Sequence, residues 1–294
     1  MKGRGSTFGA ISIVNAIAGG KGVTASTKLG TESVVELEKR SGGWAVFVNE
    51  RQVESRLIDE TVRLTLKTAG KEPGEYSGTV RTTCVLPMGV GLKTSSSSSA
   101  ATALAVFAAV GQRAFDPQKI LAISVEASLA SGASVTGALD DCASCLLGGT
   151  NMADNLGRKI ERSKLFDRPL KVVIKVPNTP SRRTSVDVQS VKRLGKVAEV
   201  LYKMSLEGDL WRAMTLNGVL YSGIYGYDST AALLAVEHGA LGASLSGTGP
   251  ATAAVFDPRA SSEMKQLTER WASDGSLVLE TETNNEHGRI EMVE

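Results

Sequence analysis

A glycine- and serine-rich segment, residues 87–100, stands between an expected strand and an expected helix. Residues 79–86 before it carry β-branched side chains and predict a strand, and the alanine-rich residues 100–110 after it predict a helix. Gly89 and Gly91 let the backbone adopt positive φ angles and approach an anion closely. The serines lead into a helix N-terminus, where free N–H groups and the helix dipole favour phosphate. The segment therefore predicts a phosphate-binding loop.

A flexible serine-rich linker is the alternative interpretation of this segment, but linkers rarely join an apolar strand to a strong helix. The segment is not a Walker P-loop, because Leu92 stands where that motif has the glycine before its lysine, Lys93. No Gly-x-Gly-x-x-Gly fingerprint follows an expected strand, so a Rossmann dinucleotide site has no support. Lys93 adds a positive charge, and serine hydroxyls can bind phosphate oxygens or a hard cation. The residues that we expect to contact phosphates here are Pro87, Gly89, Gly91, Leu92, Lys93, Ser95, Ser96, Ser97, Ser98 and Ser99.

The composition favours an ordinary globular protein of a reducing compartment. The chain has 294 residues, enough for one large domain or two ordinary ones, and its formal net charge of +2 gives no electrostatic footprint for nucleic acid. We see neither a secretory signal nor an apolar run long enough to span a membrane. Three cysteines, Cys84, Cys142 and Cys145, cannot pair completely, so we expect a cytoplasmic protein with no membrane partner. Cys142 and Cys145 form one Cys-x-x-Cys pair without a second pair, so a zinc site lacks ligands.

The order of the expected elements indicates an α+β protein. The strands that we predict are 11–17, 34–38, 44–48, 79–86, 171–176, 251–256 and 277–280. The helices that we predict are 53–69, 100–110, 116–129, 140–148, 186–206, 209–220, 229–237 and 263–272. The polar residues 152–165 read as a turn or hairpin. We place one domain at residues 1–160 and a second at residues 161–294.

Three segments of the chain resemble motifs of the GHMP kinases, a superfamily that includes galactokinase, homoserine kinase and mevalonate kinase. Pro87-x-Gly-x-Gly-Leu-Lys, with its serines and Ala100, is similar to their second motif. Residues 246–251, Ser-Gly-Thr-Gly-Pro-Ala, are similar to their third motif, a glycine-rich loop near the active site; a tight turn before a strand is the alternative. Residues 134–141, Ser-Val-Thr-Gly-Ala-Leu-Asp-Asp, resemble the segment that carries the catalytic aspartate. The order and spacing agree, so the resemblance covers most of the chain.

Within this superfamily the chain is most similar to the archaeal type of shikimate kinase. Residues 13–22, Ile-Val-Asn-Ala-Ile-Ala-Gly-Gly-Lys-Gly, are similar to the opening of those enzymes, although the serine run is two residues longer than expected. The resemblance implies a two-domain α+β GHMP kinase fold with the active site between the domains. It also implies phosphorylation of the shikimate 3-hydroxyl by ATP with Mg²⁺, in a monomer or homodimer. The alternatives are a GHMP kinase of the homoserine or mevalonate type, and a GHMP-fold protein that binds its ligand without catalysis.

The resemblance further implies how the site handles phosphate and metal. Phosphoryl transfer needs positioning and charge neutralisation more than covalent chemistry. The two glycines of the third motif, Gly247 and Gly249, are implied to contact the ATP phosphates. Magnesium is implied to bind Ser99 or Ser98 together with Glu126. Glu126 lies in an otherwise apolar helix, where a carboxylate is either at the solvent edge or aimed into a site.

Two acidic residues and a lysine are the catalytic candidates. Asp141 is the implied base for the substrate hydroxyl, on a count back from Gly148–Gly149. Asp140 stands beside it, and either acid is also explained as a first-turn residue that the helix dipole favours. Lys21 is implied to orient the substrate; the alternative is an exposed lysine in a turn between two glycines.

The substrate contacts are the least defined part of this interpretation. Arg182 and Arg183 follow a proline-containing loop and could bind a substrate carboxylate in bidentate fashion, or could lie in a solvated loop. Thr248 is the third candidate for a substrate contact. The sequence gives no support for a serine hydrolase, because His238 and His287 are the only histidines and no Gly-x-Ser-x-Gly motif exists.

Overall fold

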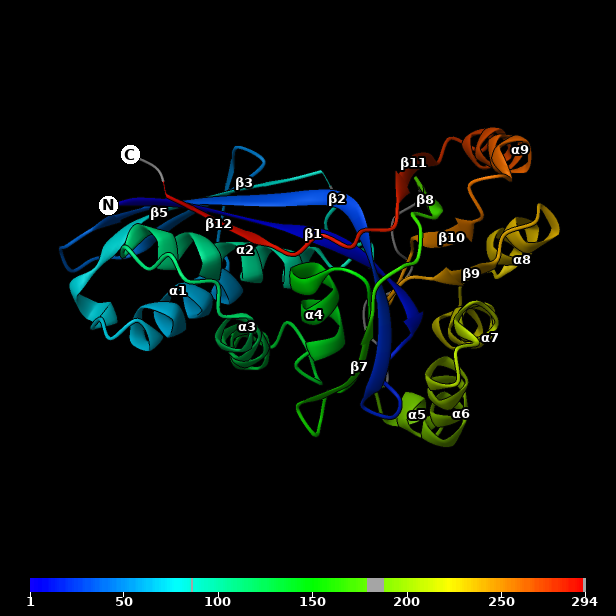
Figure 1. Cartoon of the computed structure of the whole chain (residues 1–294), viewed down its shortest axis with the longest axis horizontal. Coiled ribbons are helices and arrows are strands. Elements are labelled where there is room, and N and C mark those ends of the chain that lie inside the picture. The colour runs from blue at the N-terminus through cyan, green and yellow to red at the C-terminus, as the bar shows by residue number, and fades with distance from the viewer. Residues whose placement is uncertain (86, 179–187, 293–294) are drawn as a thin grey trace.

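The structure is a computed structural model that describes residues 1–85, 87–178 and 188–292. Within these ranges the strands form one sheet of eight and one of four, and helices cover both (Figure 1). The strands are β1 (Lys2–Val14), β2 (Lys21–Glu38), β3 (Trp44–Val48), β4 (Arg51–Val53), β5 (Ser77–Cys84), β6 (Thr150–Asp154), β7 (Lys159–Lys164), β8 (Lys171–Val176), β9 (Gly242–Leu245), β10 (Thr252–Phe256), β11 (Leu277–Glu282) and β12 (Arg289–Met292). The helices are α1 (Arg56–Thr68), the 3-10 turn η1 (Pro73–Glu75), α2 (Thr94–Ala109), α3 (Pro117–Ser131), α4 (Leu139–Leu147), α5 (Val188–Lys192), α6 (Gly195–Leu206), α7 (Leu210–Tyr225), α8 (Thr230–Glu237) and α9 (Ser261–Ala272). None of the helices within the described ranges is long and apolar enough to cross a membrane.

The larger sheet is built around two long antiparallel strands, β1 and β2. Its order is β12-β1-β2-β5-β3-β4, and β6 pairs with β2 and with β7. The first residues of β2 pair with β6 and its later residues pair with β5. The strands predicted at residues 11–17 and 34–38 cover only the last four residues of β1 and the last five of β2, and the first of them runs three residues past the end of β1. The prediction missed the rest because several inward positions carry hydroxyls, such as those of Thr7 and Thr24, which are buried and hydrogen-bonded rather than apolar.

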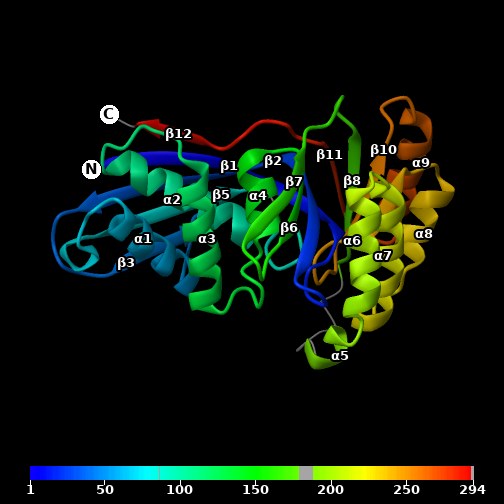
Figure 2. The ribbon, with the colours of Figure 1, turned by 60° about the horizontal axis from the view of Figure 1, so that its bottom comes forward.

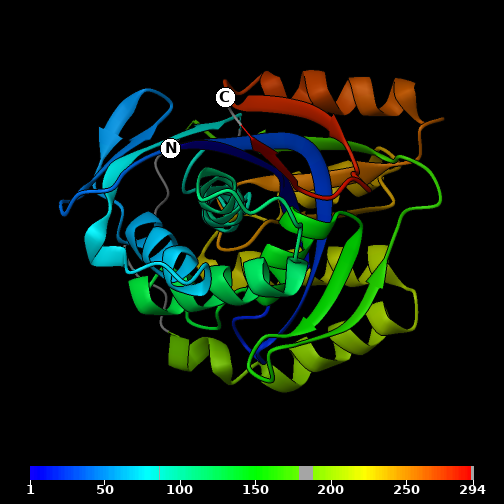
Figure 3. The ribbon, with the colours of Figure 1, turned by 60° about the vertical axis from the view of Figure 1, so that its left-hand side comes forward.

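Helix α2 packs closely against β1 because small residues line both elements. A Cβ atom at Gly3 would lie 2.2 Å from the carbonyl oxygen of Ala105, and one at Gly5 would lie 2.4 Å from that of Ala101. Only glycine admits the helix backbone this close to the strand. Helices α1 to α4 gather on one face of the larger sheet (Figures 1 and 3).

Helix α2 begins at Thr94, well before the predicted start at residue 100, so the serine run belongs to the helix. The Ser97 hydroxyl lies 3.0 Å from the Thr31 hydroxyl, and the Ser99 hydroxyl lies 2.9 Å from the Thr61 hydroxyl. Serine is a weak helix former, which is why the sequence favoured a loop here. Burial against partner hydroxyls on β2 and α1 overrides that preference.

The smaller sheet, in the order β11-β8-β10-β9, is covered on both faces. Along β8, the side chain of Val173 packs in one cluster with residues of α8 and α9, whereas Val172 and Ile174 pack in another with residues of α6 and α7. Figure 2 shows α6, α7 and α8 side by side along this sheet. The predicted strand 171–176 is confirmed, whereas the single helix predicted at residues 186–206 is wrong: α5 and α6 are separate helices.

The larger sheet continues beyond residue 160. Strands β6 and β7 form a hairpin that crosses this position, and the C-terminal strand β12 returns to pair with β1 (Figure 1). The hairpin alternative for residues 152–165 is therefore confirmed. The division of the chain at residue 160 stays a prediction.

The end of β1 ties the two groups of elements together. The Asn15 backbone N–H donates to the Asn217 side-chain oxygen (2.8 Å), and the Tyr221 hydroxyl donates to the Asn15 carbonyl (3.1 Å). Both partners lie on α7. The turn after β1 is thereby fixed at the junction where the candidate site lies.

Candidate active site

A cavity of about 410 Å³ lies at this junction, a size typical of small-molecule sites. Its walls come from the end of β1, the loop before α2, the first turns of α2 and α4, the segment between α3 and α4, and the loop after β9. The lining residues are Ser12, Asn15, Ala16, Ile17, Gly89, Gly91, Leu92, Lys93, Thr94, Ser95, Ser96, Ser128, Ala133, Ser134, Val135, Thr136, Ala138, Asp140, Asp141, Gly247 and Thr248. Two helix N-termini thus meet at one cavity, which suits an anionic ligand.

The loop before α2 turns sharply toward the cavity. Gly89 and Gly91 have φ angles of 73° and 89°, and Lys93, the N-cap residue of α2, has a φ of 63°. The N-cap side chain makes no capping hydrogen bond to α2. The backbone N–H groups of the first turn therefore face the cavity without a capping acceptor. The Pro87 carbonyl closes the loop by accepting a hydrogen bond from the Thr94 hydroxyl (3.3 Å).

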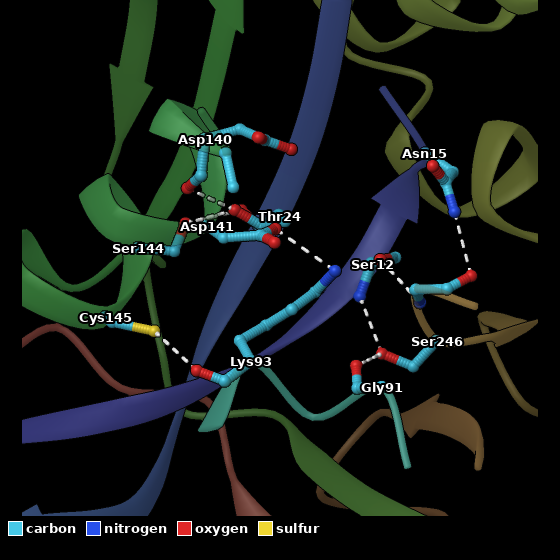
Figure 4. Close-up of polar contacts among 12 residues, drawn as sticks. Ser12, Asn15, Thr24, Gly91, Lys93, Asp140, Asp141, Ser144, Cys145 and Ser246 are labelled. Atoms are coloured by element: carbon cyan, nitrogen blue, oxygen red, sulfur yellow. Dashed lines mark hydrogen bonds and ion pairs between the residues drawn. The ribbon is translucent and has the colours of Figure 1, made fainter. Parts of the chain in front are cut away.

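The two glycine-rich segments, far apart in sequence, are hydrogen-bonded to each other. The Ser246 hydroxyl donates to the Gly91 carbonyl (2.8 Å) and accepts from the Ser12 backbone N–H (3.2 Å), as Figure 4 shows. A Cβ atom at Gly91 would lie 1.9 Å from the Ser246 carbonyl oxygen. Glycine at this position is therefore required by close backbone approach as well as by its positive φ.

The loop after β9 presents its backbone to the cavity. The Gly247 N–H donates to the Ser12 hydroxyl (2.9 Å), and the Gly247 carbonyl accepts from the Asn15 amide (2.8 Å). Thr248 lines the cavity beside it. Gly249 has a φ of 75° and packs by its backbone against Leu245, so its part is to shape the loop.

Lys93 and Asp141 form an ion pair in the cavity wall. The Lys93 ammonium lies 3.1 Å from the Asp141 carboxylate, and the two side chains are 9% and 17% exposed. Figure 4 shows the Lys93 side chain extending from the loop near Gly91 toward α4. The pair places one cation and one carboxylate side by side in the cavity wall.

Asp140 is the more deeply buried of the two acids. It is 3% exposed, and its carboxylate accepts a hydrogen bond from the Asn155 amide (2.8 Å). Burial, followed by the Asp141 charge, raises the pKa of Asp140 to about 7, against the opposing effects of Lys93 and Asn155. The two adjacent acids therefore have different surroundings and different chemical behaviour.

Replacing Asp140 by Asn is expected to flatten the pH dependence of stability. An unfolded Asp ionises near about pH 4, whereas burial raises the pKa of Asp140 to about 7 in the folded protein. The folded state thus holds this proton more tightly, so the resulting stabilisation is complete below about pH 4 and is lost as the pH rises through about 7. Calorimetry should show the wild-type Tm falling, relative to Asp140→Asn, between about pH 4 and pH 7. Asp167→Asn, at an exposed acid, should parallel the wild type; parallel curves for Asp140→Asn would contradict the assignment.

Of the predicted catalytic residues, Lys21 lies outside the cavity lining. The Lys21 ammonium lies 3.9 Å from a Glu161 carboxylate oxygen and 5.5 Å from the centre of the Tyr202 ring, away from the cavity lining. Arg182 and Arg183 fall outside the described residues. The role of Lys21 in orienting substrate has no geometric support here.

The serines that we assigned to phosphate and metal also need correction. Ser95 and Ser96 line the cavity, but Ser97 and Ser99 direct their hydroxyls to Thr31 and Thr61. Ser98 is buried on the same helix, outside the lining. Because the helix starts at Thr94, only its first turn reaches the cavity, and the later serines are too far along the helix axis.

A magnesium site fits these residues only with oxygen atoms supplied by a nucleotide. Among the described residues no group of three or more His, Cys, Asp and Glu side chains could hold a metal ion. Mg²⁺ usually keeps several waters and binds substrate phosphates with one or two carboxylates, so a sparse protein donor set suits it. Glu126 makes an ion pair with Arg158, and both side chains are about half exposed. Such a pair is worth about 0–1 kcal/mol and would open at little cost.

Comparison with known proteins places this site in context. Residues 56–149, which contain the loop before α2 and both acids, match the family described as GHMP kinases N terminal domain. The chain is 37% identical over 287 residues to a shikimate kinase of Methanosarcina acetivorans, covering 97% of this chain and 95% of that one. It is 35% identical to a shikimate kinase of Methanothrix thermoacetophila, covering 99% and 96% of the two chains.

Solved structures share the fold at low sequence identity. A mevalonate kinase of Methanococcus jannaschii superposes with a TM-score of 0.75 at 13% identity, over 95% of this chain and 97% of that one. A homoserine kinase of Cytophaga hutchinsonii superposes with a TM-score of 0.73 at 17% identity, over 99% and 97%. The predicted α+β GHMP kinase architecture is thereby confirmed.

Proposed function

The chain belongs to the GHMP kinase family, and from that premise we propose that it is a shikimate kinase, which transfers the γ-phosphoryl group of ATP to the 3-hydroxyl of shikimate. The observation that carries this proposal is the Lys93–Asp141 pair between two helix N-termini in a 410 Å³ cavity. Near-full-length similarity to archaeal shikimate kinases supports the choice of substrate. The protein is therefore a kinase of small alcohols. On this proposal it catalyses the step that consumes shikimate in the synthesis of aromatic compounds.

The residues of the cavity divide the chemistry between them. The first turn of α2 would hold the nucleotide phosphates through its N–H groups, and the Gly247 loop would shape the wall beside them. Asp141 would accept the proton of the substrate hydroxyl. The hydroxyl oxygen would then bond to the γ-phosphorus, and the bond between this phosphorus and the ADP oxygen would break. Lys93 would neutralise the negative charge that spreads over the transferring phosphoryl oxygens. Asn15 and Thr248 would meet the acceptor from the opposite wall.

Magnesium enters this proposal as the partner of the nucleotide. Ser95 and Glu126 would hold it together with the phosphates, in place of the Ser98 or Ser99 ligand that we first expected. When bound, the ion supplies charge neutralisation to the β- and γ-phosphate oxygens. Monomer or homodimer, and residence in the cytoplasm, belong to the same proposal.

ADP release is expected to require ATP, magnesium and shikimate together. A coupled assay over shikimate, homoserine, mevalonate and galactose, each at matched concentration, measures the choice directly. Turnover of homoserine or mevalonate without turnover of shikimate would contradict shikimate as the substrate and would still support kinase activity. Tight nucleotide binding with no turnover of any acceptor would favour a non-catalytic binding protein.

Changing Glu126 to Gln is expected to raise the magnesium concentration that gives half-maximal rate. The change is nearly isosteric and removes the charge that a metal ligand needs. Arg158→Gln is the matched control, because it removes the other half of the same exposed ion pair and leaves the carboxylate free. The control should leave the magnesium requirement unchanged or lower it. If both variants need the same magnesium concentration for half-maximal rate, Glu126 is a surface residue and not a metal ligand.

A further inference from the structure

Asn155 holds Asp140 at two points. It follows β6 and is 2% exposed. Its amide nitrogen donates to the Asp140 carboxylate (2.8 Å), and its amide oxygen accepts from the Asp140 backbone N–H (3.0 Å). One side chain therefore fixes both the main chain and the carboxylate of the residue beside Asp141.

The backbone contact compensates for a missing helix cap. The N-cap residue of α4 is Ala138, which has a φ of 53° and makes no side-chain cap hydrogen bond. An N-cap side chain normally accepts from the second or third helical N–H. Asp140 is the second residue of α4, so Asn155 supplies from another element the hydrogen bond that Ala138 cannot make.

The rest of Asp140 is enclosed by β2. A Cβ atom at Gly22 would lie 2.1 Å from the second carboxylate oxygen of Asp140, and the Thr24 hydroxyl donates to the Asp140 carbonyl (2.6 Å). Asn155 is itself anchored, because its N–H donates to the Gly20 carbonyl (2.9 Å). With these contacts the first turn of α4 has one position relative to the cavity.

We propose that Asn155 is a positioning residue for phosphoryl transfer: it fixes the first turn of α4 so that Asp141 meets Lys93 and the acceptor hydroxyl. This inference rests on the proposed function of the cavity. The hydrogen bond from Asn155 also favours the ionised form of Asp140 and lowers its pKa, as Lys93 does, against burial and the Asp141 charge. Tyr202 of α6 is a further titratable group within electrostatic range of Asp140.

The chain offers a matched control for Asn155→Ala. Asn151 lies on β6, the strand that ends just before Asn155, is fully buried, and donates to the Ser144 hydroxyl (3.1 Å) and the Gly148 carbonyl (2.9 Å) toward the other end of α4. Asn151→Ala removes equivalent hydrogen bonds without touching either acid. It therefore measures what the loss of a buried amide does to the fold alone.

Steady-state kinetics on the full-length variants separate positioning from stability. Asn155→Ala is expected to lower kcat by about 10²-fold, the cost of misplacing a reacting group by about 1 Å, with KM for ATP and shikimate within about twofold of wild type. Asn151→Ala should lower Tm by a similar amount and keep kcat near the wild-type value. If Asn155→Ala does not fold, Asn155→Asp, which keeps the size and the acceptor for the Asp140 N–H, should show the same selective loss of kcat. Equal kcat values in the Asn155 and Asn151 variants would overturn the inference.

A second measurement does not depend on turnover. Carbon-13 NMR titration of the Asp140 carboxyl should show a higher midpoint in Asn155→Ala than in wild type, and an unchanged midpoint in Asn151→Ala. Absence of turnover with every acceptor would contradict the proposed function. The NMR titration would still test whether Asn155 is hydrogen-bonded to the Asp140 carboxylate. An unchanged Asp140 midpoint in Asn155→Ala would overturn the inference even in an active kinase.

Discussion

Replacing Asp141 by Asn is expected to lower kcat on the order of 10²-fold or more, the range that a positioned general base contributes. The change keeps the size of the side chain and removes the proton acceptor and the negative charge beside Lys93, whose ammonium lies 3.1 Å away. Substrate and ATP should still bind, because the first turn of α2 and the Gly247 loop are untouched. Pre-steady-state phosphoryl transfer with shikimate and ATP measures the chemical step itself.

Asp140→Asn is the control for this experiment. Asn has nearly the size of Asp, so this variant can keep both hydrogen bonds between residue 140 and Asn155. The kcat of Asp140→Asn should therefore fall less than that of Asp141→Asn. A larger loss in Asp140→Asn would exchange the roles of the two acids. Near-normal rates in both variants would remove the start of α4 from the reaction.

The parts of the site that the sequence predicted are those with a local signal. The loop before α2 could be predicted because Gly89 and Gly91 stand between a strand and a helix, and the structure gives both positive φ angles. Asp141 was singled out by the resemblance to the GHMP kinases, and its carboxylate lies beside Lys93 in the cavity wall. The residue types of the loop are dictated by neighbours a few positions away in the chain.

The parts that the sequence missed depend on contacts between distant segments. Ser97 and Ser99 look like loop residues in sequence, and only their partners on β2 and α1 make a buried helix of them. Lys21 stands between two glycines and was implied as a site residue by the resemblance, yet it is the first residue of β2 and its ammonium lies 3.9 Å from Glu161 on β7. Asn155 has no sequence signal, because its partner Asp140 is reached through the fold of a hairpin and not through a motif.

Gly91→Val is expected to weaken ATP binding by roughly 5- to 150-fold, the equivalent of about 1–3 kcal/mol of overpacking strain. The Gly91 φ of 89° is unfavourable for a β-branched residue. In addition, the new Cβ would meet the Ser246 carbonyl oxygen at 1.9 Å, a backbone atom that cannot rotate away. The two glycine-rich loops would have to separate, which moves the phosphate-facing backbone on both sides of the cavity.

Gly89→Val separates these two causes, because Gly89 has a similar φ of 73° but, beyond its chain neighbours, no atom of the described residues within 4 Å of the position of its Cβ. It therefore carries the backbone strain of a positive φ without the collision between loops. Calorimetric titration with a non-hydrolysable ATP analogue should show a larger loss of affinity in Gly91→Val than in Gly89→Val, with both variants folded by their Tm. Equal losses would attribute the effect to φ alone. Full affinity in a folded Gly91→Val would mean that the Gly91–Ser246 contact does not shape the phosphate site.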